Sequence, residues 1–310
     1  MDLKQLRYFC SIYDNKSLSA AADAERIAVS ALSYHLANLE AEIGAPLFTR
    51  KSRGLEATAA GERLYFHARS ILKTVEVAKR DLSTFRDNVS GEVSLAMAYS
   101  AIQAIGVQLA KVVVEDYPDL QLNMIESLSS TTLLHLSSAD ADLGLAYNPP
   151  LTSTFKATPI LEEDLVLIGK REIIGSGSEP VTVPELLDFK IIMLRQGMAA
   201  RALLDHHKTL EQIYATSQLQ MNSVHAISGA VREGLGCTIG TTLFMGDEIK
   251  SGRLHWRPII SPTLTRTLYL CEQTDRPPTI ALETIRDLIR DLMVRAVNDG
   301  IWPARLIEAE

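Results

Sequence analysis

Residues 17–53 read SLSAAADAERIAVSALSYHLANLEAEIGAPLFTRKSR. An alanine-rich amphipathic turn opens the stretch, a short break follows at 26–28, and a second amphipathic stretch runs over 29–43. A segment led by proline then carries three basic residues, Arg50, Lys51 and Arg53. Two short helices, a tight turn and a basic hairpin are typical of a winged helix-turn-helix, which places one helix in the major groove of DNA. The stretch therefore predicts sequence recognition and not chemistry.

Local signals set the expected helix boundaries on both sides of the break. Ser17 can accept a free backbone N–H of the first short helix, so it is the expected N-cap. Gly44, followed by a proline, is the expected end of the second helix. Four aliphatic residues of that helix recur at helical spacing and form one apolar stripe: Leu32, Leu36, Leu39 and Ile43. An earlier helix is expected from the apolar repeat over residues 3–13.

A longer helix is predicted from Thr58 onward, and it carries a heptad repeat. Apolar residues recur with strict 4-3-4-3-4-3 spacing at Leu64, Ala68, Ile71, Val75, Ala78, Leu82 and Phe85. An amphipathic helix packed only on its own domain is one explanation. The unbroken 3.5-residue period favours a partner helix, because the apolar face of a single globular helix drifts toward a period of 3.6. We therefore expect dimerisation through residues 59–88.

Charge is divided unevenly along the chain. The net charge of the whole chain is −7. Residues 1–89 hold 13 Lys and Arg against 11 Asp and Glu, whereas residues 90–310 hold 18 against 27. Because salt screens charges beyond ~8 Å, local sign matters for phosphate contact more than the total does. A mixed-charge surface is the plainer explanation for the N-terminal excess.

Length and composition limit the class of protein. With 310 residues, 46% hydrophobic and 22% charged, the chain suits two or three ordinary globular domains. No apolar run approaches the ~20 residues that span a bilayer, and the start lacks a secretory signal, so no membrane association is expected. Three scattered cysteines, Cys10, Cys237 and Cys271, indicate the cytoplasm and no disulfide framework.

After a short polar break at 87–91 the pattern changes to alternating strands and helices. Apolar runs, expected as strands, lie at Val93–Ala98, Leu120–Ile125, Leu143–Tyr147, Leu165–Ile168, Lys190–Leu194, Leu219–Met221, Cys237–Ile239 and Leu268–Cys271. Amphipathic stretches, expected as helices, lie between them at 102–116, 131–138, 199–212, 224–233 and 279–297. This alternation predicts an α/β fold with largely parallel sheets, arranged as one sheet or as two lobes.

No catalytic set emerges from the sequence. There is no GxSxG, no P-loop and no GxGxxG motif. His206 and His207 have no partner at ligand spacing, and the cysteines form no metal-binding pattern. Asp140 and Asp142 flank a strand start and are expected to be structural. The chain is therefore not expected to be an enzyme or to need a cofactor or metal.

At this point the motifs match a known family: the chain resembles the LysR-type transcriptional regulators over its whole length. The resemblance is densest in the first 70 residues, in LRYF (Leu6–Phe9), S-L-S-x-A-A (Ser17–Ala22), IGAPLFTR (Ile43–Arg50) and T-x-A-G (Thr58–Gly61). It is looser in PILEEDLVLIG (Pro159–Gly169) and REGLGCTIG (Arg232–Gly240). The nitrogen- and sulfur-assimilation regulators are the nearest subgroup.

The resemblance implies three regions. Residues 1–58 would form the winged helix-turn-helix, with the helix-turn-helix at about 18–37, and residues 59–88 the linker helix. Residues 91–310 would form a two-lobed effector domain like the periplasmic solute-binding proteins, with lobe I at about 91–160 and 268–300 and lobe II at about 161–267. The family also implies a homotetramer, built as a dimer of dimers, that bends double-stranded promoter DNA. RNA polymerase is a further candidate partner.

The chain departs from the family where its recognition helix begins. The usual Ser, Gln and then Pro or Ser are replaced by Ala28, Val29 and Ser30. Alanine cannot accept the free backbone N–H bonds, which costs about 1 kcal/mol. Valine cannot make the bidentate adenine contact open to glutamine, although its methyls can touch a thymine methyl. A common Arg-Gln pair is likewise replaced by Tyr34 and His35, so a different operator preference is expected.

Candidate DNA contacts follow from the second helix and the wing. The candidates on the helix are Val29, Ser30, Ser33, Tyr34 and His35. Solvated polar residues are the plainer explanation, and His35 could instead pack against the first helix. Arg50, Lys51 and Arg53 suit phosphate or minor-groove contact. Glu40 is expected to bond within its own domain.

Candidate effector contacts follow strands at the point where a helix begins. Ser100, Ser129 and Ser130 hold such places, and the resemblance points to the positions of Ser100 and Ser129 in family pockets. Free N–H groups at helix N-termini bind anions, but simple N-capping is the alternative. Arg195 and Arg201, with Ser223 and His225 at the rim, are candidates for holding a carboxylate or sulfate of a small, anionic effector.

Three hypotheses follow. The first is a transcription regulator whose effector domain controls promoter binding and bending. The second keeps DNA binding but makes the C-terminal domain an oligomerisation module, with control by protein abundance. The third is an enzyme or solute-binding protein with an incidental helix-turn-helix, against which the absent signal sequence and catalytic set argue.

Overall fold

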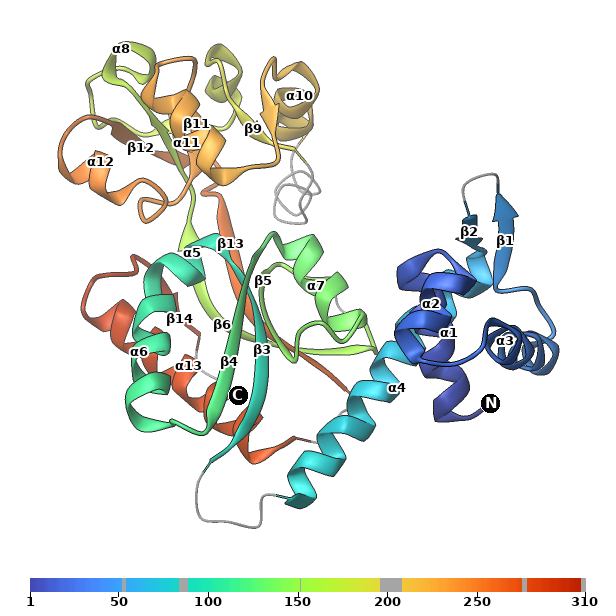
Figure 1. Ribbon diagram of the computed structural model, residues 1–310. Helices are drawn as coiled ribbons and strands as arrows, with labels where there is room; N and C mark the ends of the chain where they lie inside the picture. The colour runs from blue at the N-terminus through green and yellow to red at the C-terminus, as the bar shows by residue number, and fades with distance from the viewer. Residues whose placement is uncertain (52–53, 84–88, 151, 196–207, 275–277, 308–310) are drawn as a thin grey trace. The chain divides into compact units, whose positions relative to one another are not determined.

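The computed structural model of the chain describes residues 1–310 apart from 52–53, 84–88, 151, 196–207, 275–277 and 308–310 (Figure 1). It divides into two compact units, one of residues 1–87 and 137–140 and the other of residues 88–136 and 141–310. Among the described residues, no helix is both long enough and apolar enough to cross a membrane.

The N-terminal unit consists of helices and one small hairpin (Figure 1). Its elements are α1 Leu3–Asn15, α2 Leu18–Glu25, α3 Val29–Ile43, β1 Phe48–Lys51, β2 Gly54–Ala57 and α4 Ala59–Ser83. Three predicted boundaries are confirmed. The Ser17 hydroxyl accepts the Ala20 N–H (3.4 Å), Arg26 ends α2 in the left-handed region, and Gly44 ends α3 with φ of 76°.

The core of this unit is apolar and includes the first turns of α4. Its buried members are Leu6, Phe9, Ile12, Ala21, Ala22, Leu32, Leu39, Leu47 and Ala68. The predicted stripe of α3 points inward for most of its length, since Leu36 is half-buried and only Ile43 is exposed. Glu40 accepts the Leu47 N–H at 2.7 Å, which confirms its role inside the domain and fixes the end of α3 to the start of the hairpin.

The second unit contains a six-stranded sheet in the order β14-β6-β13-β5-β3-β4. Its strands are β3 Gly91–Ala98, β4 Leu120–Ser127, β5 Leu143–Tyr147, β6 Phe155–Asp164, β13 Thr265–Gln273 and β14 Arg305–Leu306. Its helices are α5 Tyr99–Ala101, the π turn η1 Ile102–Gly106, α6 Val107–Asp116, α7 Ser129–Ser137 and α13 Ile280–Asn298. Because side chains alternate across a strand, the two faces of this sheet have separate cores.

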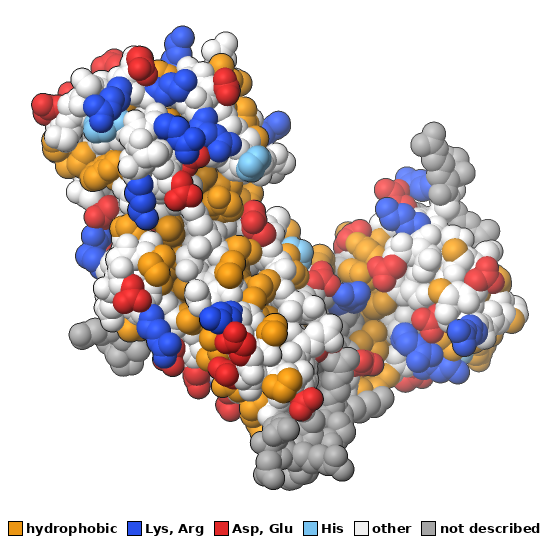
Figure 2. Space-filling view, turned by 60° about the vertical axis from the view of Figure 1, so that its left-hand side comes forward, with side chains coloured by type: hydrophobic (Ala, Val, Ile, Leu, Met, Phe, Trp, Pro, Cys, Tyr) orange, Lys and Arg blue, Asp and Glu red, His pale blue; other side chains and the backbone are white. Residues whose placement is uncertain are grey.

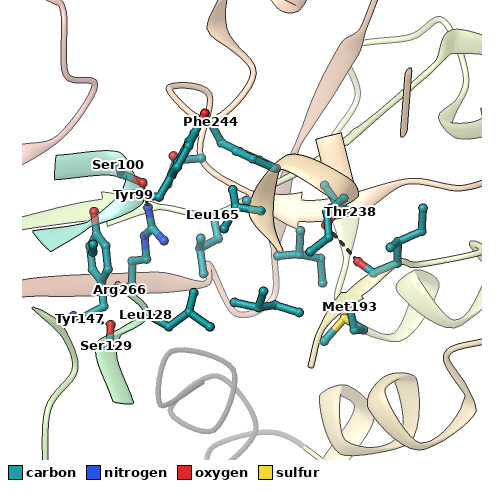
Figure 3. A pocket seen from close by; sticks show the side chains of 18 of the residues that line it. Tyr99, Ser100, Leu128, Ser129, Tyr147, Leu165, Met193, Thr238, Phe244 and Arg266 are labelled. Carbon is teal, nitrogen blue, oxygen red and sulfur yellow. Dashed lines mark hydrogen bonds between the residues drawn. The ribbon is translucent and has the colours of Figure 1, made fainter. Parts of the chain in front are cut away.

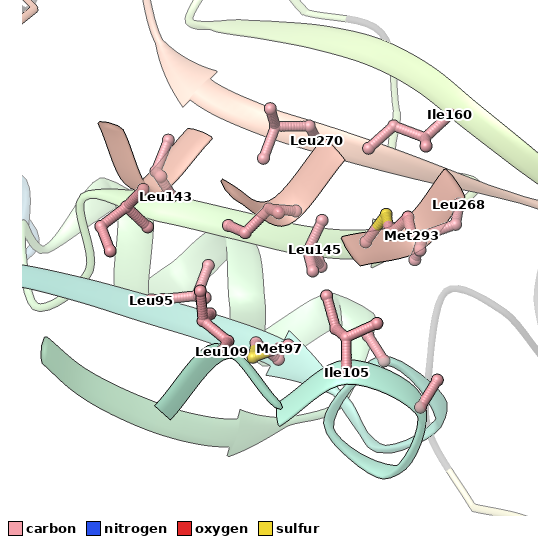
Figure 4. Packing of buried hydrophobic residues seen from close by; sticks show 14 of the residues in the cluster. Leu95, Met97, Ile105, Leu109, Leu143, Leu145, Ile160, Leu268, Leu270 and Met293 are labelled. Atoms are coloured by element: carbon pink, nitrogen blue, oxygen red, sulfur yellow. The ribbon is translucent and has the colours of Figure 1, made fainter. Parts of the chain in front are cut away.

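The larger core lies between the sheet and the layer of α6 and α13. Leu95 and Met97 of β3 meet Leu109 of α6 and Met293 of α13 there (Figure 4). The intervening Ala96 faces the other way, into the smaller core against α7. The sheet is thus covered on both faces, which holds the ends of β3 and β4 in fixed positions.

A second, smaller sheet has the order β11-β7-β12-β8, and β9 and β10 pair beside it. The strands of this part of the chain are β7 Val166–Gly169, β8 Val181–Thr182, β9 Met193–Leu194, β10 Gln220–Met221, β11 Thr238–Gly240 and β12 His255–Ile260. Its helices are α8 Arg171–Ile174, η2 Pro184–Asp188, α10 Lys208–Thr216, α11 Val224–Arg232 and α12 Gly246–Lys250. The two sheets make two lobes, and the chain passes between them from β6 to β7 and from β12 to β13.

The prediction of largely parallel sheets is wrong. In the larger sheet β3 pairs parallel with β4 and β5, but β5, β6 and β14 all meet antiparallel neighbours. In the smaller sheet β7 runs antiparallel to both β11 and β12. The physical reason is that the chain leaves the first lobe on β6 and returns on β13, so these two strands run in opposite directions.

Four strands had no counterpart in the sequence pattern, the two-residue strands β8 and β14 and the longer strands β6 and β12. β12 was absent from the expected strands, and so was β6, which carries Pro159 in its middle and charged residues at its end. Pro159 pairs with Tyr269 where the register of β13 shifts, and this irregularity accommodates a residue without an N–H. Most of the helix expected at 199–212 lies outside the described residues, and α10 covers its end.

Candidate functional site

One face of α3 is free of the domain core. Ser30, Ser33 and Tyr34 are exposed on it, and Tyr34 shows 66% of its surface. Val29, in the first turn, is exposed as well. Leu32 lies between them in sequence but is fully buried. The helix therefore buries one side and offers the other, as a helix that enters a groove must do.

The start of α3 lacks the side-chain cap, as the sequence predicted. Ala28 is the N-cap residue in extended backbone, and its side chain makes no capping hydrogen bond. The first N–H groups of a helix have no partner within the helix itself. At this end of α3 they are therefore left to solvent or to a bound group.

His35 differs from the other four helix candidates. Its ring is half-buried, and its centroid lies 5.1 Å from that of Tyr8 on α1. This favours packing against the first helix, the alternative that the sequence left open, over a contact with DNA.

The hairpin β1–β2 is fastened to the end of α1. The Leu55 N–H donates to the Lys16 carbonyl at 2.9 Å, and a Cβ on Gly54 would lie 2.6 Å from the same oxygen. Lys51 is exposed and its Nζ lies 3.4 Å from the Glu56 carboxylate. Arg53 and the side chain of Arg50 lie outside the described residues. Among the three basic candidates of the wing, Lys51 is thus the one whose side chain belongs to the described residues.

The heptad residues of α4 fall into two groups. Ala68 is buried and Leu64 half-buried in the core of the N-terminal unit. Ile71 and Ala78 are exposed, and Val75 is half-buried. Phe85 and the side chain of Leu82 lie outside the described residues. The start of the repeat is therefore used within the domain, and its continuation leaves Ile71 and Ala78 available to a partner helix.

A pocket in the second unit brings Ser100 and Ser129 together (Figure 3). Ser100 lies just after β3, and Ser129 begins α7 just after β4. Both residues are buried, and both hydroxyls accept a hydrogen bond. Ser129 Oγ accepts the Tyr147 N–H at 2.9 Å, and Ser100 Oγ accepts from Arg266 Nη2 at 2.8 Å. The parallel pairing of β3 with β4 places the two residues at one edge of the sheet.

Arg266 is the charged residue that the sequence reading missed. It enters the pocket from β13 and lies over the ring of Tyr147, with its guanidinium carbon 3.7 Å from the ring centroid (Figure 3). Its Nε donates to Glu163 at 2.9 Å, and Glu163, fully buried, also accepts from Trp302 Nε1 at 2.9 Å. Arg266 and Glu163 are partners in the β13–β6 register, 103 residues apart in sequence.

The protonation of this group is set by its surroundings. Burial acts most strongly on the pKa of the Arg266 guanidinium and lowers it, but the charge of Glu163, the neighbouring Tyr147 and the hydrogen bond to Glu163 together outweigh burial, so the pKa is raised. Burial raises the pKa of the Tyr147 hydroxyl well above its usual range. At neutral pH Arg266 is therefore a charged guanidinium, paired with Glu163 and lying beside a neutral phenol.

The opposite wall of the pocket comes from the smaller sheet and is mostly apolar. Ile192, Ile227 and Phe244 line it together with two buried threonines, Thr238 and Thr241. The Thr238 hydroxyl donates to the Ile192 carbonyl at 3.0 Å. The Thr241 hydroxyl has no hydrogen-bond partner within the described part of the chain. The cavity volume is about 140 Å³.

Of the remaining effector candidates, four described residues are absent from the lining of this pocket: Arg195, Ser223, His225 and Ser130. Arg195 and Ser223 line a separate hollow beside β10, and Ser223 caps α11 by accepting the Ala226 N–H at 3.2 Å. His225 is exposed on α11, and Ser130 is half-buried outside the lining. Arg201 lies outside the described residues. For Ser223, capping explains the residue fully.

Neither the surface charge nor the possible metal ligands indicate another site in the described part of the second unit. In the view of Figure 2 its acidic and basic side chains are interspersed, which does not form the single-signed track that phosphates attract. Within the described ranges, no three His, Cys, Asp or Glu side chains are grouped so as to hold a metal ion. Cys10, Cys237 and Cys271 are free and buried.

Two family models match the chain. Residues 3–62 match the bacterial regulatory helix-turn-helix protein of the lysR family, and residues 86–294 match the LysR substrate binding domain. The first match contains α1 to β2, and the second contains the pocket with Ser100, Ser129 and Arg266.

Relatives and solved structures extend the match to the whole length. The chain is 31% identical over 240 residues to the nitrogen assimilation regulatory protein nac of Klebsiella aerogenes, covering 77% of this chain and 78% of the relative. It is 24% identical to the HTH-type transcriptional regulator BbuR of Bordetella bronchiseptica, covering 98% and 93%. A full-length OxyR variant from Pseudomonas aeruginosa has a TM-score of 0.66 at 19% identity, covering 94% and 95%, and so shares the fold.

Proposed function

The chain belongs to the LysR family of DNA-binding transcriptional regulators, and from that premise we propose that a small molecule bound between its two lobes controls how it holds promoter DNA. The observation that carries the proposal is the pocket itself. It is lined from both lobes and contains a half-buried cation, Arg266, and buried hydroxyls. A cytoplasmic place of action, where promoter DNA lies, is part of the proposal, and RNA polymerase remains a candidate partner.

DNA reading is assigned to the exposed face of α3. Ser33 and Tyr34 would contact base edges, with Ser30 and Val29 beside them near the start of the helix. Arg50, Lys51 and Arg53 of the hairpin would hold the phosphate backbone. His35 would act indirectly, by fixing α3 against α1.

Control by a ligand requires that it prefer one arrangement of the lobes. The pocket meets this requirement because β6 and β13, which carry Glu163 and Arg266, are the strands through which the chain passes between the lobes. A molecule that contacts both walls binds a closed arrangement better than an open one, and it shifts the population by that difference in affinity. This supports effector sensing over a purely oligomerising C-terminal domain.

Pairing of subunits is assigned to the exposed part of the α4 repeat. Ile71 and Ala78 are spaced one heptad apart on the helix surface. Two such helices would set the separation of two copies of α3, and hence the spacing of half-sites on DNA. A dimer of such dimers completes the proposal.

The wing provides the test of DNA binding. Arg50→Ala with Arg53→Ala should weaken binding to every DNA sequence and reduce the slope of log K against log salt by roughly 1.8, since each lost phosphate contact contributes about 0.9. Lys250→Ala with Arg253→Ala removes the same charge from exposed positions of the smaller lobe and is the matched control. Mobility-shift titrations at several salt concentrations measure both. An unchanged slope in the wing variant would refute the assignment.

A further inference from the structure

The charge of Arg266 is already compensated inside the protein. Its Nε and one Nη2 hydrogen are used by Glu163 and Ser100, and the Glu163 carboxylate is fully buried. Among the described residues that line the pocket, Arg266 is the only charged one. An anionic ligand would bring a second negative charge to a guanidinium that one carboxylate has neutralised. The effector therefore need not be an anion, which had been the expectation from the sequence.

The charge of Arg266 is compensated within the protein, but some hydrogen-bonding groups of the pocket are not yet engaged there. Arg266 Nη1 has no partner among the described residues, although the side chain is only 16% exposed. On the facing wall the Thr241 hydroxyl is buried to 98% and is also without a partner there. A buried polar group left without a hydrogen bond is destabilising, by about 1–3 kcal/mol, so the Thr241 hydroxyl favours a ligand that supplies the missing bond. Arg266 Nη1 offers such a ligand a donor on the opposite wall.

The rest of the lining determines what the body of the ligand is like. Leu165, Ile192, Val224, Ile227 and Phe244 present hydrocarbon to the cavity. The cavity volume of about 140 Å³ is close to the roughly 150 Å³ of an apolar protein cavity known to hold benzene. A compact apolar body of about that size therefore fits between the two polar ends.

We propose that the pocket binds an uncharged small molecule with a ring-sized apolar body, whose acceptor oxygen meets Arg266 Nη1 and whose second polar group meets Thr241. This rests on the proposed function and names the class of its effector. Such a molecule joins the larger lobe, through Arg266, to the smaller lobe, through Thr241. It satisfies both groups without disturbing the pairing of Arg266 with Glu163.

Matched amides and carboxylates test the charge preference. Benzamide, 3- and 4-hydroxybenzamide and the corresponding benzoates are titrated into the full chain, with binding followed by saturation-transfer NMR. We expect each amide to bind about tenfold more tightly than its carboxylate. Equal or tighter binding of the carboxylates would overturn the inference but leave an effector pocket in place. Binding of neither class would overturn both the inference and the effector role, while DNA retardation would still report the regulator itself.

Thr241→Val tests the second polar contact, with Thr238→Val as the matched control. Both threonines are buried in the same wall, but only the Thr238 hydroxyl already has a partner. We expect the gain in affinity from benzamide to the better hydroxybenzamide, about three- to tenfold, to vanish in Thr241→Val and to persist in Thr238→Val. A gain that persists in both variants would contradict the role of Thr241.

Glu163→Gln tests the compensation of Arg266 directly. Removal of the carboxylate leaves the guanidinium with a net positive charge, so the variant should now prefer the benzoates, and carboxylates should raise its melting temperature more than amides do. An unchanged preference in the folded variant would contradict the inference. If the variant does not fold, the wild-type titrations and the two threonine variants decide the matter.

Discussion

At the scale of the residue, the chemistry of each site depends on which neighbours a side chain has already engaged. Arg266 contacts a carboxylate, a hydroxyl and an aromatic ring at once, and its Nη1 has no partner among the described residues. Ser129, by contrast, has its hydroxyl occupied by the Tyr147 N–H. Two residues of the same pocket therefore differ in what they can offer to a ligand.

The uncapped helix start at Ala28 gives a prediction about the stability of the N-terminal unit. Ala28→Ser places a hydroxyl at an N-cap whose backbone is already extended (φ −69°, ψ 141°), so a serine needs no rearrangement to accept an amide of the first turn. The free energy of unfolding should rise by about 1 kcal/mol. Urea denaturation measures this free energy of unfolding. Ser17→Ala is the reciprocal control, because it removes the existing cap of α2 and should lower the stability. A loss of stability in Ala28→Ser would contradict the prediction.

At the scale of the element, α1 and α4 are held together by two tyrosines. The rings of Tyr13 and Tyr65 stack with centroids 3.8 Å apart. The Tyr13 hydroxyl donates to Glu62 and the Tyr65 hydroxyl donates to Asp14, each at 2.6 Å. Each helix thus supplies one ring, one donor and one acceptor. This reciprocal arrangement fixes the direction in which the linker helix leaves the DNA-binding unit.

The same pair predicts how stability falls at alkaline pH. Burial, and then the hydrogen bond to Glu62, raises the pKa of Tyr13 from 10.0 to about 12. The folded state therefore holds its proton more tightly than the unfolded state, and this stabilisation is complete below pH 10 and is lost as the pH rises to about 12. Melting temperatures of Tyr13→Phe should be lower than wild type at neutral pH and should approach it between pH 10 and 12. Tyr34→Phe, at an exposed position, should follow the wild-type curve throughout.

A charged residue placed in the exposed part of the α4 repeat should prevent the pairing of subunits. Ile71→Glu would put an unpaired carboxylate into the paired seam, and burial of such a charge costs several kcal/mol. Sedimentation should then show monomers at concentrations where the wild type is a dimer or larger. His67→Glu adds the same charge at an exposed position outside the repeat and should leave the assembly unchanged. Identical sedimentation of Ile71→Glu and wild type would exclude this seam.

Helices and their ends could be predicted from the sequence because their signals are local. Ser17, Gly44 and the stripe through Leu32 and Leu39 act within a few residues of the boundary they set. The direction of the strands could not be predicted from the sequence, because it depends on partner strands that are far apart along the chain, such as β6 and β13. For the same reason Ser100 and Ser129 were found from their place after strands, whereas the Arg266–Glu163 pair, joined only by register, was not.

At the scale of the whole molecule, the C-terminal residues support a strand behind the pocket without lining it. Trp302 is fully buried in the larger core, and its indole N–H donates to the same Glu163 that pairs with Arg266. β14, directly after it, pairs with β6, where the Arg305 guanidinium binds Glu162 and Asp164. The last strand thus supports one of the two strands that join the lobes, so the end of the chain stabilises the site from behind.

Trp302→Phe should therefore affect one unit of the molecule and not the other. The change keeps an aromatic ring in the core but leaves a buried Glu163 oxygen without its donor, which costs about 1–3 kcal/mol in addition to the lost ring volume. Urea unfolding should show the loss in the second unit, and amide affinity in the pocket should fall because Arg266 is less firmly held. The salt slope for non-specific DNA should be unaltered, since that slope depends on phosphate contacts of the N-terminal unit. If Trp302→Phe changes the slope, the two units are coupled even without a ligand, and the separation of reading from sensing proposed above is wrong.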